Sequence, residues 1–97
     1  MINEYENLKN FLAGYFHQDW LYDDESAIAV VERYLSEWPR DEVLVVIEEI
    51  GQLLEEVKNE ADLRAAVLKL GSYYEVGADG LTYRDWLKSV SERLAAG

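Results

Sequence analysis

Few residues of this chain are of the types that catalyse reactions or bind metal ions. Cysteine is absent, which excludes thiol catalysis, disulfides and zinc–thiolate sites. The single histidine, His17, is followed by Gln18 and Asp19, and this short run could supply a proton-transfer pair or two metal ligands. Because stable metal sites need three or four ligands, we expect His17 and Asp19 to have structural roles.

Three acidic clusters and one glycine-containing loop are the other patterns that suggest chemistry. Asp23-Asp24-Glu25 lacks the alternating oxygens and the central glycine of a calcium loop, and helix capping accounts for it better. The glutamate pairs at 48–49 and 55–56 lack the histidine partner of helical carboxylate metal sites. The loop at 77–80 lacks the lysine of a phosphate-binding loop. We therefore predict no catalytic residue, no cofactor and no metal, and a protein that is not an enzyme.

The chain is strongly acidic, and the acidity is unevenly distributed. Twenty Asp and Glu residues against nine Lys and Arg residues give a formal net charge of −11. The net charge is −5 over residues 1–40, −7 over 41–62 and +1 over 63–97. Such a surface repels phosphate backbones and anionic lipids, which predicts no direct nucleic-acid partner and no membrane partner. A solvated surface that keeps a small protein soluble explains this charge, and so does a surface matched to a basic protein.

Length and hydropathy patterning predict one small helical domain. The 97 residues suffice for a single domain, 1–97, because two halves would each be too small to bury a core. No apolar run is long enough for a membrane span and no signal-peptide pattern is present, so we expect a cytoplasmic protein. Apolar residues recur at steps of three and four, which predicts an all-α fold of four to five amphipathic helices. The predicted helices cover about residues 4–15, 25–38, 40–58 and 60–70, and a last one that begins after Thr82.

Capping signals and apolar stripes predict where these helices begin and which faces they bury. The expected N-caps are, in chain order, Asn3, Asp23 or Asp24, Asn59 and Thr82. We expect Gly71 to end the fourth helix in a left-handed conformation, Asp85 to complete a capping box, and Leu81 to pack on Trp86. The inward face of the second helix is predicted as Ile28, Val31, Leu35 and Trp38. The predicted core comprises Phe11, Phe16, Trp20, Leu35, Ile47, Ile50, Leu54, Val67, Trp86 and Leu87.

Two dense blocks of sequence lie near the two ends of the chain. Residues 15–20 read YFHQDW after a glycine, and residues 80–87 read GLTYRDWL. In their composition, order and separation these blocks resemble the two signatures of the contact-dependent growth inhibition (CDI) immunity proteins, the CdiI family. The resemblance extends from Leu8 to Leu94, with an acidic helical stretch between the blocks.

The resemblance implies a function in bacterial competition. Such proteins are small cytoplasmic antitoxins of Gram-negative bacteria that are not enzymes and act on no small-molecule substrate. Each binds, in an expected 1:1 complex, the C-terminal toxin domain of its cognate effector, often a nuclease, and neutralises it. The charge agrees with this implication, because a nuclease must hold a phosphate backbone and an acidic protein complements its basic cleft.

The residues divide into an expected scaffold and an expected toxin-binding set. The structural signature comprises Tyr15, Phe16, His17, Asp19, Trp20, Tyr83, Trp86 and Leu87. The expected toxin-binding residues are acids and aromatics that lie off the apolar stripes: Tyr22, Asp23, Asp24, Glu25, Glu48, Glu49, Glu55, Glu56 and Tyr73.

Two other interpretations agree equally well with the composition. One is an acidic regulatory or adaptor domain that binds a basic intracellular protein, and the other is a small structural subunit of a larger enzyme. Gene context separates them, because an antitoxin gene of this kind should lie immediately downstream of the gene for a very large secreted protein.

Overall fold

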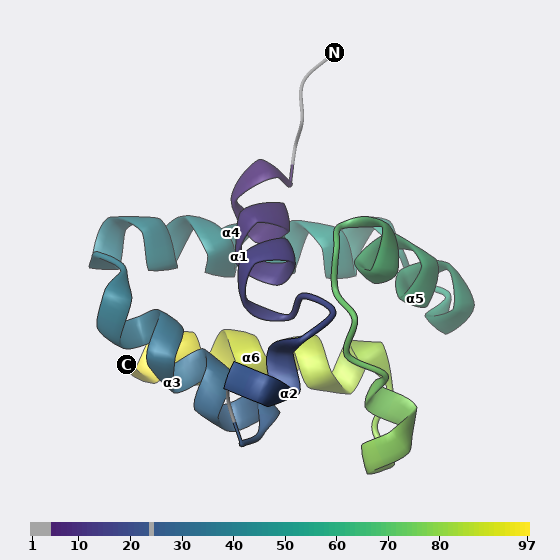
Figure 1. Cartoon of the computed structure of the whole chain (residues 1–97). Helices are drawn as coiled ribbons and strands as arrows, with labels where there is room; N and C mark the ends of the chain where they lie inside the picture. Colours follow the sequence, from purple (N-terminus) through teal and green to yellow (C-terminus); the bar gives the residue numbers. More distant parts are fainter. Residues whose placement is uncertain (1–4, 24) are drawn as a thin grey trace.

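The computed structural model describes residues 5–23 and 25–97, and these residues form helices and connections without any strand (Figure 1). The elements are, in chain order, α1 (Glu6–Tyr15), α2 (Trp20–Asp23), α3 (Ala27–Glu37), α4 (Arg40–Glu56), α5 (Glu60–Lys69), the 3-10 helix η1 (Val76–Asp79) and α6 (Tyr83–Ala96). The predicted all-α fold is therefore confirmed. The two shortest elements, α2 and η1, lie in segments that were expected to be connectors. Within the described chain, no helix is long and apolar enough to cross a membrane.

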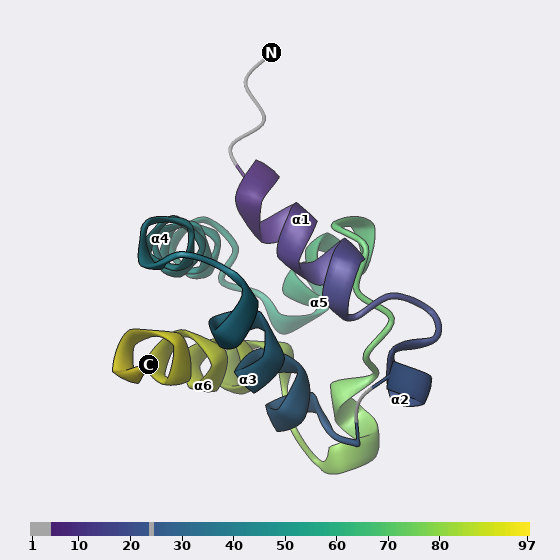
Figure 2. The same cartoon turned by 60° about the vertical axis from the view of Figure 1, so that its left-hand side comes forward.

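An antiparallel pair of helices, α4 and α6, is the frame of the fold. The two helices lie side by side and run in opposite directions in Figure 1, and both views show α1 on the α4 side and α3 on the α6 side of this pair (Figure 2). At one end, the guanidinium of Arg84 donates to two carbonyl oxygens at the end of α4, at 2.5 and 3.3 Å. At the other end, Arg40 donates to two carbonyl oxygens of the last turn of α6, at 2.8 and 3.0 Å. Each arginine thus satisfies terminal carbonyl groups that a helix cannot pair internally.

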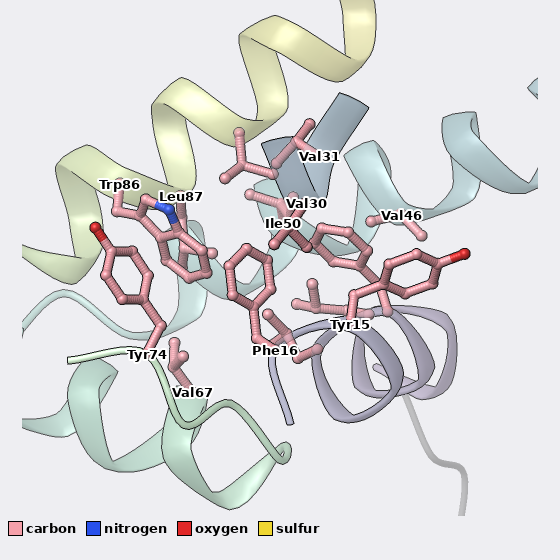
Figure 3. Close-up of a cluster of buried hydrophobic side chains, with 14 of the residues drawn as sticks. Tyr15, Phe16, Val30, Val31, Val46, Ile50, Val67, Tyr74, Trp86 and Leu87 are labelled. Atoms are coloured by element: carbon pink, nitrogen blue, oxygen red, sulfur yellow. The ribbon is translucent and has the colours of Figure 1, made fainter. Parts of the chain in front are cut away.

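Aromatic rings form the centre of the core, and they come from three distant segments (Figure 3). The centroid of the Phe16 ring lies 5.1 Å from that of Trp86 and 5.5 Å from that of Trp20. Tyr74, which follows α5, lies 5.2 Å from Trp86. Phe16 and Trp86 meet edge to face, at 89°, the arrangement that aromatic quadrupoles favour. This cluster joins the end of α1, the 72–81 segment and α6.

The predicted core is largely the observed one. Seven of its ten members are buried: Phe11, Phe16, Trp20, Ile50, Val67, Trp86 and Leu87. The other three are half-buried and pack against the same cluster: Leu35, Ile47 and Leu54.

The expected inward face of the second helix is partly wrong. Ile28 is 72% exposed and Trp38 is 45% exposed. The buried residues of α3 are Val30, Val31 and Tyr34, so Val31 is buried as predicted, and the main neighbours of α3 are α6 and α1. The helix is therefore rotated relative to the predicted stripe, and Ile28 in its first turn is left exposed.

The N-caps expected at Asn59 and Thr82, and the positive φ expected at Gly71, are confirmed. The Asn59 side chain accepts a hydrogen bond from the N–H of Asp62 at 3.1 Å, and that of Thr82 accepts one from the N–H of Asp85 at 3.0 Å. Gly71 follows α5 with a φ of +110°, and a Cβ there would lie 2.7 Å from a side chain of α1. Glycine is therefore required at this position for both backbone conformation and space.

The capping signals of the first half differ from the expectation. The N-cap of α3 is Ser26, whose hydroxyl accepts a hydrogen bond from the N–H of Ala29 at 3.1 Å. Asp23 is instead the last residue of α2, because the aromatic connector forms an extra helical turn before α3 begins. Asn3 and Asp24 lie outside the described residues.

A buried glutamate fastens α1 to α4. Glu49 is only 7% exposed, and its carboxylate accepts hydrogen bonds from the backbone N–H of Leu8 and from the side-chain amide of Asn7, both at 2.8 Å. The expectation that Glu49 lies on the outer face of its helix is therefore wrong. The first N–H groups of a helix have no partner within it, and α1 crosses α4 where Glu49 can supply one.

The first prediction compares two tryptophans. We expect Trp86→Ala to lower the free energy of unfolding by about 3–5 kcal/mol, because a fully packed ring leaves a cavity. Trp38→Ala should cost only about 1 kcal/mol, since this ring is half exposed and loses one hydrogen bond, from its Nε1 to the Tyr15 hydroxyl. Urea unfolding followed by far-UV circular dichroism measures both losses, and equal losses would contradict this core.

The second prediction compares two adjacent glutamates. Glu49→Ala should lower the free energy of unfolding by about 1–3 kcal/mol, because it leaves donors at the start of α1 without a partner. Glu48→Ala should change it by less than about 0.5 kcal/mol, because Glu48 is exposed. The same urea measurement applies, and a tolerated Glu49→Ala would rule out the capping role.

Candidate partner-binding surface

The lone histidine takes part in the turn that leads from α1 to α2. Its Nδ1 accepts a hydrogen bond from the N–H of Asp19 at 3.1 Å, and its carbonyl oxygen accepts one from the N–H of Trp20 at 3.0 Å. The carbonyl oxygen of Asp19 in turn accepts from the N–H of Tyr22 at 2.9 Å. Over residues 5–23 and 25–97, no group of three or more His, Asp and Glu side chains could hold a metal ion.

Exposed apolar side chains gather on α2, the start of α3 and the 72–81 segment. Five large ones are between 40% and 90% exposed: Leu21, Tyr22, Ile28, Tyr73 and Leu81. Figure 2 shows α2 beside the segment that carries η1, so residues far apart in the sequence meet here. Concentrations of exposed apolar surface mark interaction sites more often than scattered single residues do.

A hollow of about 380 Å³ lies between α2 and the 72–81 segment. Its aromatic and aliphatic walls include Trp20, Leu21, Tyr73 and Tyr74, and its acidic rim consists of Glu25, Glu75 and Asp79. We call this hollow, together with the neighbouring Tyr22, the acidic–aromatic face. It combines the two kinds of side chain that the sequence pattern assigned to partner binding.

The three rim acids differ in whether their carboxylates already have a partner within the protein. Glu75 forms an ion pair with Arg64 at 3.0 Å. Asp79 accepts a hydrogen bond from the Tyr74 hydroxyl. Burial raises the pKa of that hydroxyl, and the bond to Asp79 raises it further, so the tyrosine stays neutral and donating at physiological pH. Glu25 is exposed and forms no ion pair with the described cations, so its charge is available to a partner.

The structure separates the expected binding residues into two places. Tyr22, Glu25 and Tyr73 belong to the acidic–aromatic face, and Asp23 is the residue that ends α2 beside it. The side chain of Asp23 and the whole of Asp24 lie outside the described residues.

The second place is the exposed side of α4, which lies away from α2 in both views (Figures 1 and 2). Glu48, Glu55 and Glu56 are exposed there. Glu55 lies 3.5 Å from Lys58, and Glu56 accepts a hydrogen bond from the Tyr5 hydroxyl at 2.6 Å. Glu49 belongs to neither place, because it caps α1.

Sequence reasoning missed several side chains of this surface. Leu21 lay in an unassigned connector, and Ile28 was placed in the core because its spacing matched the apolar stripe. Glu75 and Asp79 lay outside the most acidic stretch. One feature of the sequence does point to this surface. Residues 20–38 contain more apolar residues than one face of a short helix can bury, so some of them must be exposed.

Comparison with known proteins gives one match. The sequence profile of the family described as CdiI immunity protein matches residues 4–94, which is nearly the whole chain and includes both sequence blocks. No match was found among curated proteins or among solved structures. Because the match covers far more than half of the chain, this protein belongs to the CdiI immunity protein family.

Proposed function

We propose that this protein neutralises the C-terminal toxin domain of its cognate contact-dependent growth inhibition effector by binding it in a 1:1 complex in the cytoplasm. The family membership supports an immunity role. The observation that carries the binding mode is the acidic–aromatic face, where exposed tyrosines and carboxylates from three segments meet. The proposed activity is inhibition by binding, without catalysis by this chain.

The chemistry of this face fits a basic partner, and we propose that the toxin is a nuclease. A nuclease presents Lys and Arg to hold a phosphate backbone. Residues 20–38 carry five acids and one base, and residues 72–81 carry two acids and no base. Opposite potentials accelerate encounter, while buried aromatic anchors and desolvated charge pairs determine how long the complex lasts.

The two acidic places have different proposed roles. Tyr22 and Tyr73 are the proposed aromatic anchors, and Asp23, Asp24 and Glu25 are the acids that pair with toxin cations. The acids on the exposed side of α4, Glu48, Glu55 and Glu56, lie too far from that contact to be buried in it. Their field attracts the toxin during approach mainly at low ionic strength, because the screening length is about 30 Å at 0.01 M salt and only about 8 Å at physiological salt.

The third prediction is a charge-reversal comparison. The probe is the toxin domain encoded immediately upstream, and binding kinetics are measured at two salt concentrations. Glu25→Lys should speed dissociation and weaken binding by roughly 2–5 kcal/mol, because it leaves a toxin cation facing a like charge in the contact. The matched double variant Glu48→Lys/Glu55→Lys should slow association at low salt and leave the dissociation rate unchanged.

Protection of cells that express the toxin is the functional readout. Wild type should protect, and Glu25→Lys should protect less well than Glu48→Lys/Glu55→Lys. If the α4 variant loses more affinity and protection than Glu25→Lys, the contact lies on α4 instead. Binding without protection would favour an adaptor, and the absence of both would refute the immunity role.

A further inference from the structure

A second, more apolar depression lies between α3 and α6, next to the acidic–aromatic face. This groove has a volume of about 310 Å³. Its walls include Ile28 and Val31 from α3, Trp86 and Val90 from α6, and Leu81 just before α6. Ala27 lines both this groove and the neighbouring hollow, so the two depressions adjoin.

Two large apolar side chains are exposed at the groove. Ile28 is 72% exposed although its spacing predicts an inward position, and Leu81, which was expected to pack on Trp86, is 40% exposed. Leu81 lines the groove together with Trp86. A position where the sequence pattern predicts burial and the fold leaves exposure is characteristic of a functional surface.

The walls of the groove are held in place before any partner arrives. Trp86 is 3% exposed and packs against both Phe16 and Tyr74 (Figure 3). At the rim, Arg93 of α6 donates two hydrogen bonds to the carboxylate of Glu32 of α3, one of them 2.6 Å long. This ion pair ties the two helices together across the groove. A preformed site binds more tightly because little ordering is required on association.

The charge around the groove indicates what kind of partner covers it. The groove itself is apolar, and the one charged residue among the described ones that line it, Arg93, is paired with Glu32. The acids beside it are Glu25, Glu75 and Asp79 of the neighbouring hollow, with which the groove shares Ala27. Two copies joined at the groove would bring their acidic–aromatic faces close together, which disfavours self-association. A partner that presents Lys or Arg beside an apolar side chain complements both the apolar groove and the acidic face next to it.

We propose that the groove between α3 and α6 receives an apolar side chain of the toxin domain, flanked by Lys or Arg residues that meet the acidic–aromatic face. This assignment rests on the proposed immunity function. The groove supplies the apolar anchor of the complex, and the adjacent face supplies its charge pairing. A few such buried anchors contribute most of the affinity in typical protein interfaces.

The fourth prediction tests the groove with two substitutions that add the same charge. Ile28→Asp should raise the dissociation constant for the toxin domain by about 10- to 100-fold, the equivalent of losing one buried aliphatic side chain. Aspartate suits the first turn of α3, so folding should be retained. Leu44→Asp, on the exposed part of α4, should change the dissociation constant by less than about twofold.

Methyl spectra of the wild-type protein provide a readout that does not depend on any variant. The chain has four isoleucines, so a sample labelled at isoleucine δ1 methyl groups gives four signals. Addition of the toxin domain should shift the Ile28 signal strongly, while those of the buried Ile50 and the half-buried Ile47 move little.

The outcomes separate the groove from the immunity function. If wild type binds the toxin but Ile28→Asp binds equally well and the Ile28 signal does not move, the groove is not a contact and the immunity function stands. If wild type does not bind the toxin at all, both proposals fail. If wild type is dimeric at the concentrations used and Ile28→Asp is monomeric, a second copy covers the groove and the proposal is overturned.

Discussion

The packing of Phe16 is the interaction on which the rest of the structure depends. Its ring packs against those of Trp20 and Trp86, and its carbonyl oxygen accepts a hydrogen bond from the N–H of Tyr73 at 2.7 Å. One residue therefore joins the end of α1, the 72–81 segment and α6 through both its side chain and its backbone. Without this junction, the short elements α2 and η1 would have no core to pack on, and the surface that they form would not exist.

The scaffold and the candidate interface are two sides of the same aromatic cluster. Trp20 and Tyr74 contribute to the core and also line the hollow of the acidic–aromatic face, while Trp86 contributes to the core and lines the groove. Buried residues of this cluster, among them Trp20 and Trp86 of the two sequence blocks, thus support the proposed binding surface from behind. In the proposed complex, the exposed side chains in front, such as Tyr22 and Ile28, contact the toxin.

The acidity of the chain serves two purposes that composition alone does not separate. Glu49 and Glu60 accept hydrogen bonds from the starts of α1 and α6, the latter through the N–H of Tyr83 at 2.6 Å, and they stabilise the fold. Glu25 and Glu48 remain exposed and contribute to the field that a basic partner meets. Counting acids therefore overstates the number that are available for binding.

The sequence by itself determined the helical architecture, most of the core, and caps such as Asn59 and Thr82, because periodicity and local hydrogen bonding act within a few residues. The tertiary structure alone decided that Glu49 is buried while the adjacent Glu48 is exposed, and that Ile28 lies in an open groove. Periodicity gives a helix an apolar face but not its rotation or the extent of its neighbours. Which residues of that face are covered depends on where α1 crosses α4 and on how α3 packs against α6, and these contacts join residues far apart in the chain.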